Sequence, residues 1–369
     1  MAGHVVAPHF TVAFDGHSLT SPAGGVRRYA SELFAALARR PDVAVVAVGA
    51  SADATLPPGV SPARAGVSLP TNLGWSLTGL PLAARGIGAD VFHAPAYTAP
   101  LWGCRPLVVS IHDVSYARRP EWYPNRLDPV RSAFYAHSAR RADRIVTCSS
   151  FSRDEILAAY QVDPERIDVV PLAAGSVFAP TPERPREPFV LHVGDLHPRR
   201  NLPMLLEVIA DLRRAESRLS AVRLVLAGAD RGQLEMLRQL AQRLGAVEAL
   251  EYVGVPDDAA LSEWYRRASL FAYPSRYEGF GLPVLEAMAS GCPVIATSAG
   301  SVPEVTGRSA MLIAPEDAPA WRAAIRHVLL DAGQASELAR TGIERAKAFT
   351  WDRTAEGTLA AYRRAVRRP

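Results

Sequence analysis

The sequence predicts an α/β protein with two doubly wound domains, each a parallel sheet covered by helices on both faces. The first observation is length, because 369 residues exceed the roughly 100–200 of one ordinary domain. The second is that short apolar runs alternate with helical patterns along the whole chain, which is typical of parallel sheets. The third is composition: 49% apolar and 21% charged residues exclude disorder as the main state.

The predicted strands are short runs of β-branched and other apolar residues. Between the first two, apolar residues from Val26 to Leu37 recur at i, i+3, i+4 and i+7, which predicts an amphipathic helix that ends before Pro41. The predicted strands are Thr11–Phe14, Val43–Val48, Asp90–His93, Leu107–Ile111, Arg144–Cys148, Phe189–Val193, Arg223–Leu226, Leu250–Val253, Leu270–Tyr273 and Pro293–Ala296.

A proline-rich segment, Pro180–Pro188, separates two βα series and has the composition of a linker. We therefore predict an N-terminal domain over residues 1–180 and a C-terminal domain over residues 181–350. A last helix, 351–369, is able to pack back on the first domain. Sheets of this kind bind ligands beyond the carboxyl ends of their strands, so a cleft between the domains is the expected site.

Charge and hydropathy exclude several classes of protein. The net charge of +4 is too small to imply a nucleic-acid partner. No run approaches the roughly 20 apolar residues of a membrane-spanning helix. The N-terminus lacks the pattern of a signal peptide and the three cysteines lack paired spacing, so we expect a cytoplasmic protein with reduced thiols. The basic tail, Arg363–Pro369, fits peripheral contact with the inner face of a membrane, but fits a solvated helix end better.

The densest chemical signal lies between Pro274 and Pro293. Glu278 is expected on a loop, because the glycines that follow it break the helix, and Glu286 about one turn inside the helix that starts near Leu282. The backbone N–H groups of residues 279–282, at a helix N-terminus, favour phosphate oxygens. A diphosphate site is therefore predicted there.

Two simpler interpretations of this segment were weighed. Gly279-Phe-Gly281 begins like a dinucleotide fingerprint, but Val284 occupies the third glycine position, so a dehydrogenase is not predicted. For an isolated pair of glutamates, a helix cap at Glu278 and a solvated Glu286 would be the better interpretation. The surrounding residues favour a functional pair.

Glu278-x7-Glu286 within Glu-Gly-Phe-Gly-Leu-Pro, followed by Gly300-Ser-Val-Pro-Glu304, resembles the donor site of the retaining glycosyltransferases of family 4. The resemblance covers nearly the whole chain and implies the GT-B fold, two Rossmann-like domains facing a cleft. It also implies transfer of a hexose from a nucleotide-diphosphate sugar with retained anomeric configuration. Phe189–Leu202 resembles the first strand of the donor domain and its basic pair, with Arg200 where the family usually has Lys.

The resemblance assigns roles to individual residues. Glu278 would bind hydroxyls of the donor sugar, Glu286 the ribose, and Arg199 with Arg200 the diphosphate; a solvated turn is the alternative for the arginines. No Asp-x-Asp triplet or His/Cys cluster is present, so neither a metal nor a cofactor is expected. The predicted catalytic residues are His112, Glu278, Arg199 and Arg200, and the predicted donor-binding residues are Gly24, Gly25, Gly194, Gly279, Phe280, Gly281, Leu282 and Glu286.

The first half contributes two further matches. Residues 23–29 resemble the family's glycine loop before the first helix, a weak signal that its position after Asp15-Gly16 strengthens. The strand 107–111 runs into His112 and Asp113, and a polar pair at the carboxyl end of a strand points into the cleft. His112 matches the family's histidine near the transferred sugar; a histidine hydrogen-bonded in a turn is the alternative.

An acceptor site is predicted after His112, where Tyr116, Trp122 and Tyr123 alternate with Arg118, Arg119 and Arg126. Aromatic faces beside cations suit a glycan, including one on a lipid diphosphate, although packing of the loop is nearly as good an explanation. Asp113, Trp122 and Tyr123 are the predicted acceptor-binding residues. This region looks most like mannosyl- and rhamnosyltransferases of polysaccharide assembly, which makes GDP-mannose the first donor to test.

Three other features were given structural interpretations. Ser152–Glu155 and Ser301–Glu304 have the spacing of capping boxes. Cys292 has no neighbour that would make it a nucleophile.

The competing functions for the whole chain are a nucleotide-sugar epimerase of the same fold and a non-catalytic nucleotide-sugar-binding subunit.

Overall fold

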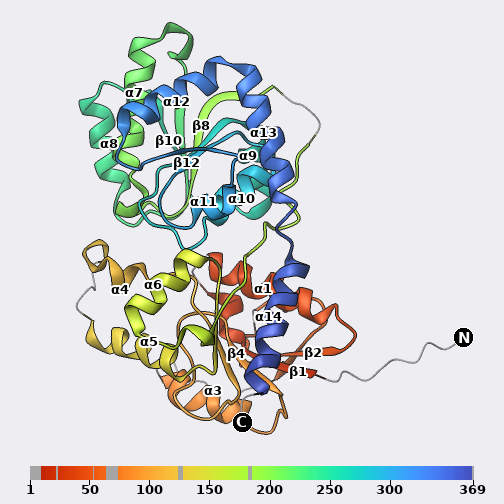
Figure 1. The fold of residues 1–369 in the computed structure, drawn as a ribbon. Coiled ribbons are helices and arrows are strands. Elements are labelled where there is room, and N and C mark those ends of the chain that lie inside the picture. The colour runs from red at the N-terminus through yellow and green to blue at the C-terminus, as the bar shows by residue number, and fades with distance from the viewer. Residues whose placement is uncertain are drawn as a thin grey trace, which may run out of the picture. The chain divides into compact units, whose positions relative to one another are not determined.

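The computed structural model describes residues 10–21, 24–52, 54–63, 74–123, 128–181 and 185–367. The chain divides into two compact units (Figure 1): unit 1 is Met1–Leu172 with Thr350–Pro369, and unit 2 is Ala173–Phe349. The division falls between Leu172 and Ala173, whereas the sequence predicted it between residues 180 and 181. Part of that proline-rich segment, 182–184, lies outside the described residues.

Unit 1 is built on a parallel sheet with the strand order β3-β2-β1-β4-β5-β6-β7. Strands β2 and β3 are added on one side of β1, and strands β4 to β7 on its other side, so the order switches between β1 and β4. Its strands are β1 Phe10–Asp15, β2 Val43–Val48, β3 Val60–Ala63, β4 Val91–Ala94, β5 Leu107–Ser110, β6 Arg144–Thr147 and β7 Ile167–Val169. Its helices are α1 Gly24–Ala38, α3 Leu80–Ala84, α4 Ser115–Arg118, α5 Pro129–Arg141, α6 Ser150–Tyr160 and α14 Trp351–Val366, with short turns η1 Gly16–Thr20, η2 Trp75–Gly79, η3 Pro120–Trp122 and η4 Pro164–Arg166.

Unit 2 repeats the architecture with the order β10-β9-β8-β11-β12-β13, again all parallel. Its strands are β8 Glu187–Val193, β9 Arg223–Ala227, β10 Leu250–Tyr252, β11 Ala268–Tyr273, β12 Val294–Thr297 and β13 Met311–Ile313. Its helices are α7 Leu202–Ala215, α8 Leu234–Arg243, α9 Asp258–Arg267, α10 Leu282–Ala289, α11 Val302–Thr306, α12 Ala318–Leu330 and α13 Ala332–Ala346, with turns η5 Pro198–Arg200, η6 Ser217–Leu219 and η7 Val247–Ala249.

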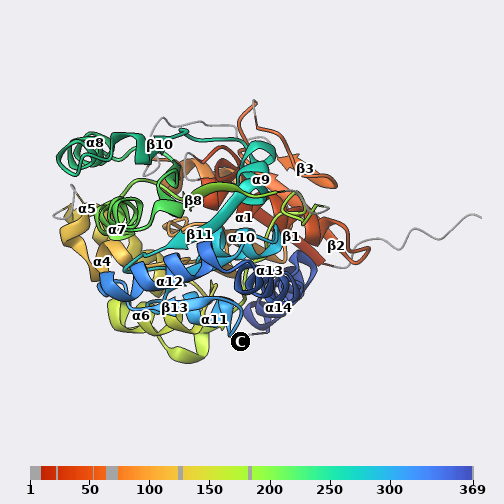
Figure 2. The same cartoon turned by 90° about the horizontal axis from the view of Figure 1, so that it is seen from above.

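Helices cover both faces of each sheet, as the sequence predicted (Figures 1 and 2). In unit 2, α7, α8 and α12 lie along one face of the sheet and α9, α10 and α13 along the other. The central strands are buried on both faces, which is why they read as continuous apolar runs rather than as alternating ones. The predicted doubly wound α/β class is therefore confirmed.

The C-terminal helix α14 belongs to unit 1 and is held there by polar contacts. Thr354 Oγ1 donates to the carbonyl of Pro171 at 2.8 Å, and Arg364 pairs with Asp168, which also receives both arms of Arg144. Arg363 pairs with Asp42 at 3.3 Å. These acidic partners pair with two of the arginines of the basic tail, and both arginine side chains stay about half exposed, which agrees with a solvated helix end.

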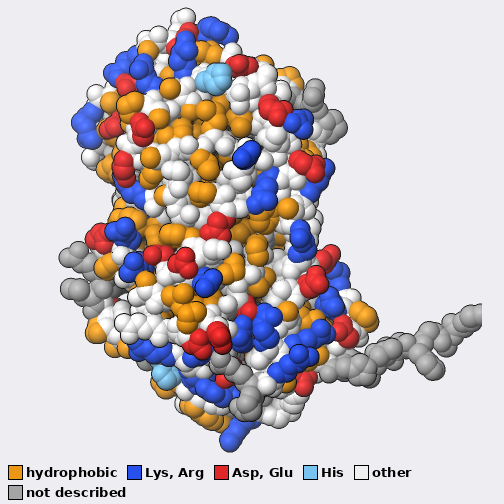
Figure 3. All heavy atoms as spheres, viewed as in Figure 1, with side chains coloured by type: hydrophobic (Ala, Val, Ile, Leu, Met, Phe, Trp, Pro, Cys, Tyr) orange, Lys and Arg blue, Asp and Glu red, His pale blue; other side chains and the backbone are white. Residues whose placement is uncertain are grey.

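The surface mixes both signs of charge. Figure 3 shows Lys and Arg side chains interleaved with Asp and Glu on the face that it presents. Among the described residues, no helix is both long and apolar enough to cross a membrane.

A first prediction concerns acid stability. Burial is the main cause that lowers the pKa of His93 and of His192 to about 3, whereas the unfolded value is near 6.5. Below pH 6.5 the unfolded chain therefore binds more protons than the folded one, so the free energy of unfolding falls as the pH falls toward 3. Each histidine contributes a slope that approaches about 1.4 kcal/mol per pH unit.

Urea denaturation between about pH 7.5 and pH 5.5 measures this slope before most carboxylates titrate. His93→Gln should reduce it for unit 1 and His192→Gln for unit 2. A slope that neither substitution changes would show that these histidines do not dominate the acid response.

Candidate functional site

The loop after β11 has the predicted form. Glu278 lies on this loop, with 6% of its surface exposed, and α10 starts at Leu282. Gly281 precedes the helix with a φ of +90°, a backbone conformation that suits glycine, and Pro283 stands in the first turn. The first turn of a helix leaves N–H groups without intrahelical partners, and the predicted diphosphate site rests on this property.

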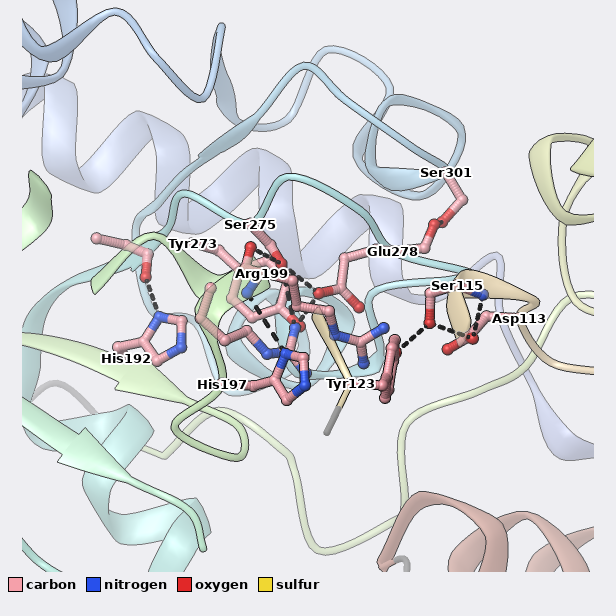
Figure 4. Close-up of polar contacts among 12 residues, drawn as sticks. Asp113, Ser115, Tyr123, His192, His197, Arg199, Tyr273, Ser275, Glu278 and Ser301 are labelled. Carbon is pink, nitrogen blue, oxygen red and sulfur yellow. Dashed lines mark hydrogen bonds and ion pairs between the residues drawn. The ribbon is translucent and has the colours of Figure 1, made fainter. Parts of the chain in front are cut away.

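Glu278 is held through both its side chain and its main chain (Figure 4). Its Oε1 accepts hydrogen bonds from Ser275 Oγ at 2.5 Å and from a guanidinium nitrogen of Arg200. Its carbonyl accepts from the N–H of Ser301 at 3.1 Å and from Ser301 Oγ at 2.9 Å. The carboxylate is therefore oriented before any ligand arrives.

Arg200 is buried against β11 rather than extended into solvent. Its Nη1 donates to the hydroxyl of Tyr273 and to Glu278, and the guanidinium carbon lies 5.2 Å from the centre of the Tyr273 ring. Burial lowers the pKa of Arg200 from its ordinary value. The alternative of a solvated turn is therefore wrong for this residue, and its immediate partner is Glu278.

Gly194, at the end of β8, makes room for that guanidinium. Its φ is +138°, and a Cβ there would lie 3.1 Å from Nη2 of Arg200. The neighbouring Arg199 is partly buried and its carbonyl accepts the N–H of Arg276 at 2.8 Å. Burial, followed by the charges of Arg199 and Arg200, lowers the pKa of His197 to about 4, which leaves this histidine neutral at pH 7.

Glu286 lies one turn into α10 as predicted, but it is almost fully buried. Its exposed fraction is 1%, and its Oε2 accepts a hydrogen bond from the hydroxyl of Tyr265 at 3.1 Å. Solvation of the side chain, the simpler interpretation of this residue, is therefore wrong. Tyr265 was missed because it belongs to the apolar stripe of α9 and looks like an ordinary core residue.

In unit 1, His112 follows β5 and is oriented from several sides. Its Nε2 lies 3.1 Å from the carbonyl oxygen of Pro95, which can only accept, so Nε2 carries the proton and Nδ1 the lone pair of the neutral ring. Burial lowers its pKa, which keeps the ring neutral at pH 7. The ring of Tyr29 meets it edge to face at 4.4 Å.

The main chain of His112 is held by two side chains. Its carbonyl accepts from Ser152 Oγ at 3.0 Å and from Cys148 Sγ at 3.2 Å. The prediction that Ser152 caps a helix is wrong, because α6 starts earlier and Ser149 is its cap.

Ser301 also fails as a predicted cap. It precedes α11 with a helical backbone conformation and makes no capping hydrogen bond, since its hydroxyl binds the carbonyl of Glu278 instead. Ser152 and Ser301, predicted to start helices, thus each hold the backbone of a predicted catalytic residue.

The remaining predicted residues of unit 1 have varied surroundings. Gly24 and Gly25 form the first turn of α1 instead of a loop before it, and both are exposed. Asp113 accepts from Ser115 Oγ at 2.8 Å, and the same Oγ is bonded to the hydroxyl of Tyr123. The guanidinium carbon of Arg119 lies 6.0 Å from the ring centre of Trp122.

The structure therefore brings together two groups of predicted residues. One, in unit 2, joins Glu278 to Arg200. The other, in unit 1, joins Asp113 to Tyr123 through Ser115.

Cys292 is buried and burial raises its pKa to about 12, which agrees with a structural role. In the described part of the chain, no cluster of three or more His, Cys, Asp or Glu side chains could hold a metal ion.

Comparison with known proteins decides the family. Residues 23–173 match the model described as Glycosyltransferase Family 4, and residues 187–331 match the model described as Glycosyl transferases group 1. The O-antigen chain mannosyltransferase B of Escherichia coli is 31% identical over 284 residues, which are 74% of each protein. The chain belongs to glycosyltransferase family 4. The resemblance stated from the motifs is thereby confirmed.

Other relatives of this glycosyltransferase are named for a different activity. The D-inositol 3-phosphate glycosyltransferases of Gordonia bronchialis and Mycobacterium marinum are 31% and 32% identical over 61% and 64% of the chain. The chain spans about half of their length, 53% in each case.

Solved structures support the GT-B fold. Sucrose-phosphate synthase from Thermosynechococcus elongatus superposes with a TM-score of 0.77 at 21% identity, over 96% of this glycosyltransferase and 98% of the other chain. WaaG, a glycosyltransferase involved in lipopolysaccharide biosynthesis, superposes with a TM-score of 0.72 at 20% identity, over 95% and 98%. At these identities the likeness concerns the fold alone.

A second prediction tests how Glu278 is positioned. Gly300 has a φ of +65°, and a Cβ there would lie 2.8 Å from the carbonyl oxygen and 2.9 Å from the nitrogen of Glu278. We expect Gly300→Ala to displace the Glu278 backbone and to lower kcat by on the order of 100-fold, because small misplacements of catalytic groups cost that much.

Gly245→Ala is the matched control, because Gly245 has a φ of +62° and nothing within 4 Å of the added Cβ. It carries the same backbone strain, about 1–2 kcal/mol, without the collision. Steady-state kinetics and thermal unfolding of both variants would measure the difference. Equal kcat values in the two would contradict a special role for Gly300.

Proposed function

We propose that this glycosyltransferase transfers a hexose, with mannose from GDP-mannose as the first candidate, to a glycan or lipid-linked glycan, with retention of anomeric configuration. The observation that carries the proposal is the preorganised Glu278 carboxylate beside the N-terminus of α10 in a chain of family 4. Unit 2 is assigned to the nucleotide-sugar donor and unit 1 to the acceptor.

In unit 2, Glu278 accepts hydrogen bonds from hydroxyls of the donor sugar. Arg199 and the N–H groups of residues 279–282 bind the diphosphate, where departure of the leaving group builds up negative charge. Arg200, which is buried, stabilises the same negative charge on the diphosphate and also orients Glu278. These contacts strengthen as the glycosidic bond breaks, so they stabilise the transition state more than the ground state.

Glu286 binds the ribose hydroxyls, and its hydrogen bond from Tyr265 sets the carboxylate plane. Gly194 allows the backbone and Arg200 to pack closely beneath the donor phosphates. Phe280 and Leu282 complete the donor-binding loop. Gly24 and Gly25, exposed in the first turn of α1, leave space for a phosphate or sugar to approach the helix N-terminus.

In unit 1, His112 offers Nδ1 as an acceptor for a hydroxyl of the transferred sugar. Asp113 and Tyr123, joined through Ser115, and the aromatic face of Trp122 contact the acceptor. The acceptor attacks from the face that the nucleotide leaves, and the departing phosphate takes its proton. This front-face displacement requires no covalent nucleophile from the protein and no metal ion.

The choice of mannose rests on the E. coli O-antigen mannosyltransferase, which covers more of the chain than the inositol phosphate enzymes do. The competing functions predict other products. An epimerase converts the donor without an acceptor, and a binding subunit leaves it intact. Product analysis with and without a glycan acceptor therefore separates the three.

A nucleotide-sugar panel is the first experiment. A donor present at 100 times its dissociation constant should raise the free energy of unfolding by about 2.7 kcal/mol, and GDP-mannose should give the largest thermal shift. Mass spectrometry then follows transfer from the stabilising donor in EDTA, where activity should persist. A larger shift with a UDP-sugar would replace the donor assignment, and loss of activity restored by Mg²⁺ would overturn the metal-free mechanism.

A third prediction separates the two glutamates. Glu286→Ala should raise the donor KM by on the order of tenfold or more with a smaller change in kcat, because a ribose contact is shared by the ground and transition states. Glu278→Ala should mainly lower kcat, because its contact is with the reacting sugar. Tyr265→Phe is a milder companion, since it removes one hydrogen bond from Glu286 and should follow the Glu286→Ala pattern. The assignment is wrong if both glutamate variants change kcat and KM alike.

A further inference from the structure

A continuous chain of hydrogen bonds crosses the core of unit 1. The hydroxyl of Tyr362 lies 2.6 Å from Nδ1 of His93, and Nε2 of His93 lies 2.8 Å from Oγ of Ser110. The same Oγ lies 2.7 Å from the hydroxyl of Tyr29. The four side chains come from α14, β4, β5 and α1, and all are buried. One polar line thus joins four elements of the unit.

The chain ends beside His112. The Tyr29 ring meets the His112 imidazole at a centroid distance of 4.4 Å and an interplanar angle of 78°. In this geometry the positive edge of one ring faces the π surface of the other, an arrangement that favours one ring orientation. The hydrogen bond to Pro95 fixes one nitrogen of the imidazole, and the contact with Tyr29 limits rotation of the ring about that bond.

An ordinary apolar core would not need this chain. Buried hydroxyl and imidazole groups cost free energy unless they are hydrogen-bonded, and each substitution along the chain would leave a partner unsatisfied. The same helix, α1, also carries Phe34, which has no polar atom and packs by its ring alone, on Phe14 at 3.6 Å and on His93 at 5.5 Å. A phenylalanine at position 29 would therefore serve packing alone.

We propose that Tyr29 is a positioning residue for His112, and that Ser110, His93 and Tyr362 fix the orientation of the Tyr29 ring. The inference rests on the catalytic role of His112 proposed above. It gives α14 a part in catalysis, because Tyr362 reaches from this helix to the far end of the chain.

The test compares three variants. Tyr29→Leu removes the ring and should lower kcat by on the order of tenfold or more, with the donor KM changed by less than about twofold. Tyr29→Phe keeps the ring edge against His112 but cuts the ring off from the hydrogen-bond chain, so it should lower kcat by about two- to fivefold, less than Tyr29→Leu and about as much as Tyr362→Phe. Leu37→Ala removes a buried side chain from the same helix, eight positions after Tyr29, and should keep the wild-type kcat despite a comparable loss of stability.

The NMR signals of the His112 imidazole, assigned through His112→Ala, give a readout independent of turnover. Tyr29→Leu should shift them and Leu37→Ala should not. Tyr362→Phe, which only breaks the bond at the far end, should shift them less and lower kcat by about two- to fivefold. This variant also serves if Tyr29→Leu does not fold.

Two results would overturn the inference: unchanged His112 signals and kcat in folded Tyr29→Leu, or equal losses of kcat in Tyr29→Leu and Leu37→Ala. An unchanged Tyr362→Phe would overturn the role of the chain. If His112→Ala itself keeps the wild-type kcat, the proposed function of His112 fails instead. The imidazole signals would still show whether Tyr29 positions the ring.

Discussion

The buried pair of Arg200 and Glu278 is the interaction on which unit 2 depends. Removing a carboxylate from water costs several kcal/mol unless a cation and further donors compensate it. Here the guanidinium and the hydroxyl of Ser275 supply that compensation, and Gly194 leaves the space the guanidinium needs. Breaking the pair by removing one partner would leave the other charge buried alone, which costs more than the pair itself contributes.

In unit 1 the candidate residue is oriented without an ion pair. That residue is a histidine that burial keeps neutral, so orientation comes from a carbonyl acceptor and from ring contacts instead of from an ion pair. In both units a serine from a later segment of the chain, Ser152 within α6 and Ser301 just before α11, binds the main-chain carbonyl of the candidate residue. Under the proposed function, negative charge develops on the departing phosphates, so the proposal places the charged groups of unit 2 there and a neutral histidine of unit 1 at a sugar hydroxyl.

Most of the fold could be predicted from sequence because parallel strands buried on both faces form conspicuous apolar runs. The strands that were missed, β3, β7 and β13, lie at sheet edges, where one side of the strand has no partner and the sequence need not be apolar. β3 contains Pro62, which cannot donate to a ladder, and β7 is interrupted by Asp168. Edge strands are defined by their neighbours more than by their own residues.

The site was predictable at the level of single residues and not at the level of their partners. Spacing placed Glu278 on a loop and Glu286 in a helix, but capping-box spacing misassigned Ser152 and Ser301. Several serines lie within four residues of one another at the start of α6, and the serine with an extended backbone caps the helix. That residue is Ser149, with φ −153° and ψ 161°. A serine hydroxyl that does not cap its helix can bind a carbonyl that the tertiary fold brings near, as those of Ser152 and Ser301 do.

The same reasoning explains why arginine can stand at position 200, where the family usually has lysine. A lysine ammonium is a compact, strongly hydrated charge, whereas a guanidinium is weakly hydrated, planar and able to lie against an aromatic ring. Arg200 lies near the Tyr273 ring, against Gly194, while its Nη1 donates to Tyr273 and Glu278. A shorter-reaching ammonium could retain the ion pair but not the planar contact with the ring, so the substitution preserves charge and changes how rigidly Glu278 is held. A rigidly held carboxylate favours a transition state with developing charge nearby, because groups that are already oriented cost no reorganisation when the bond breaks.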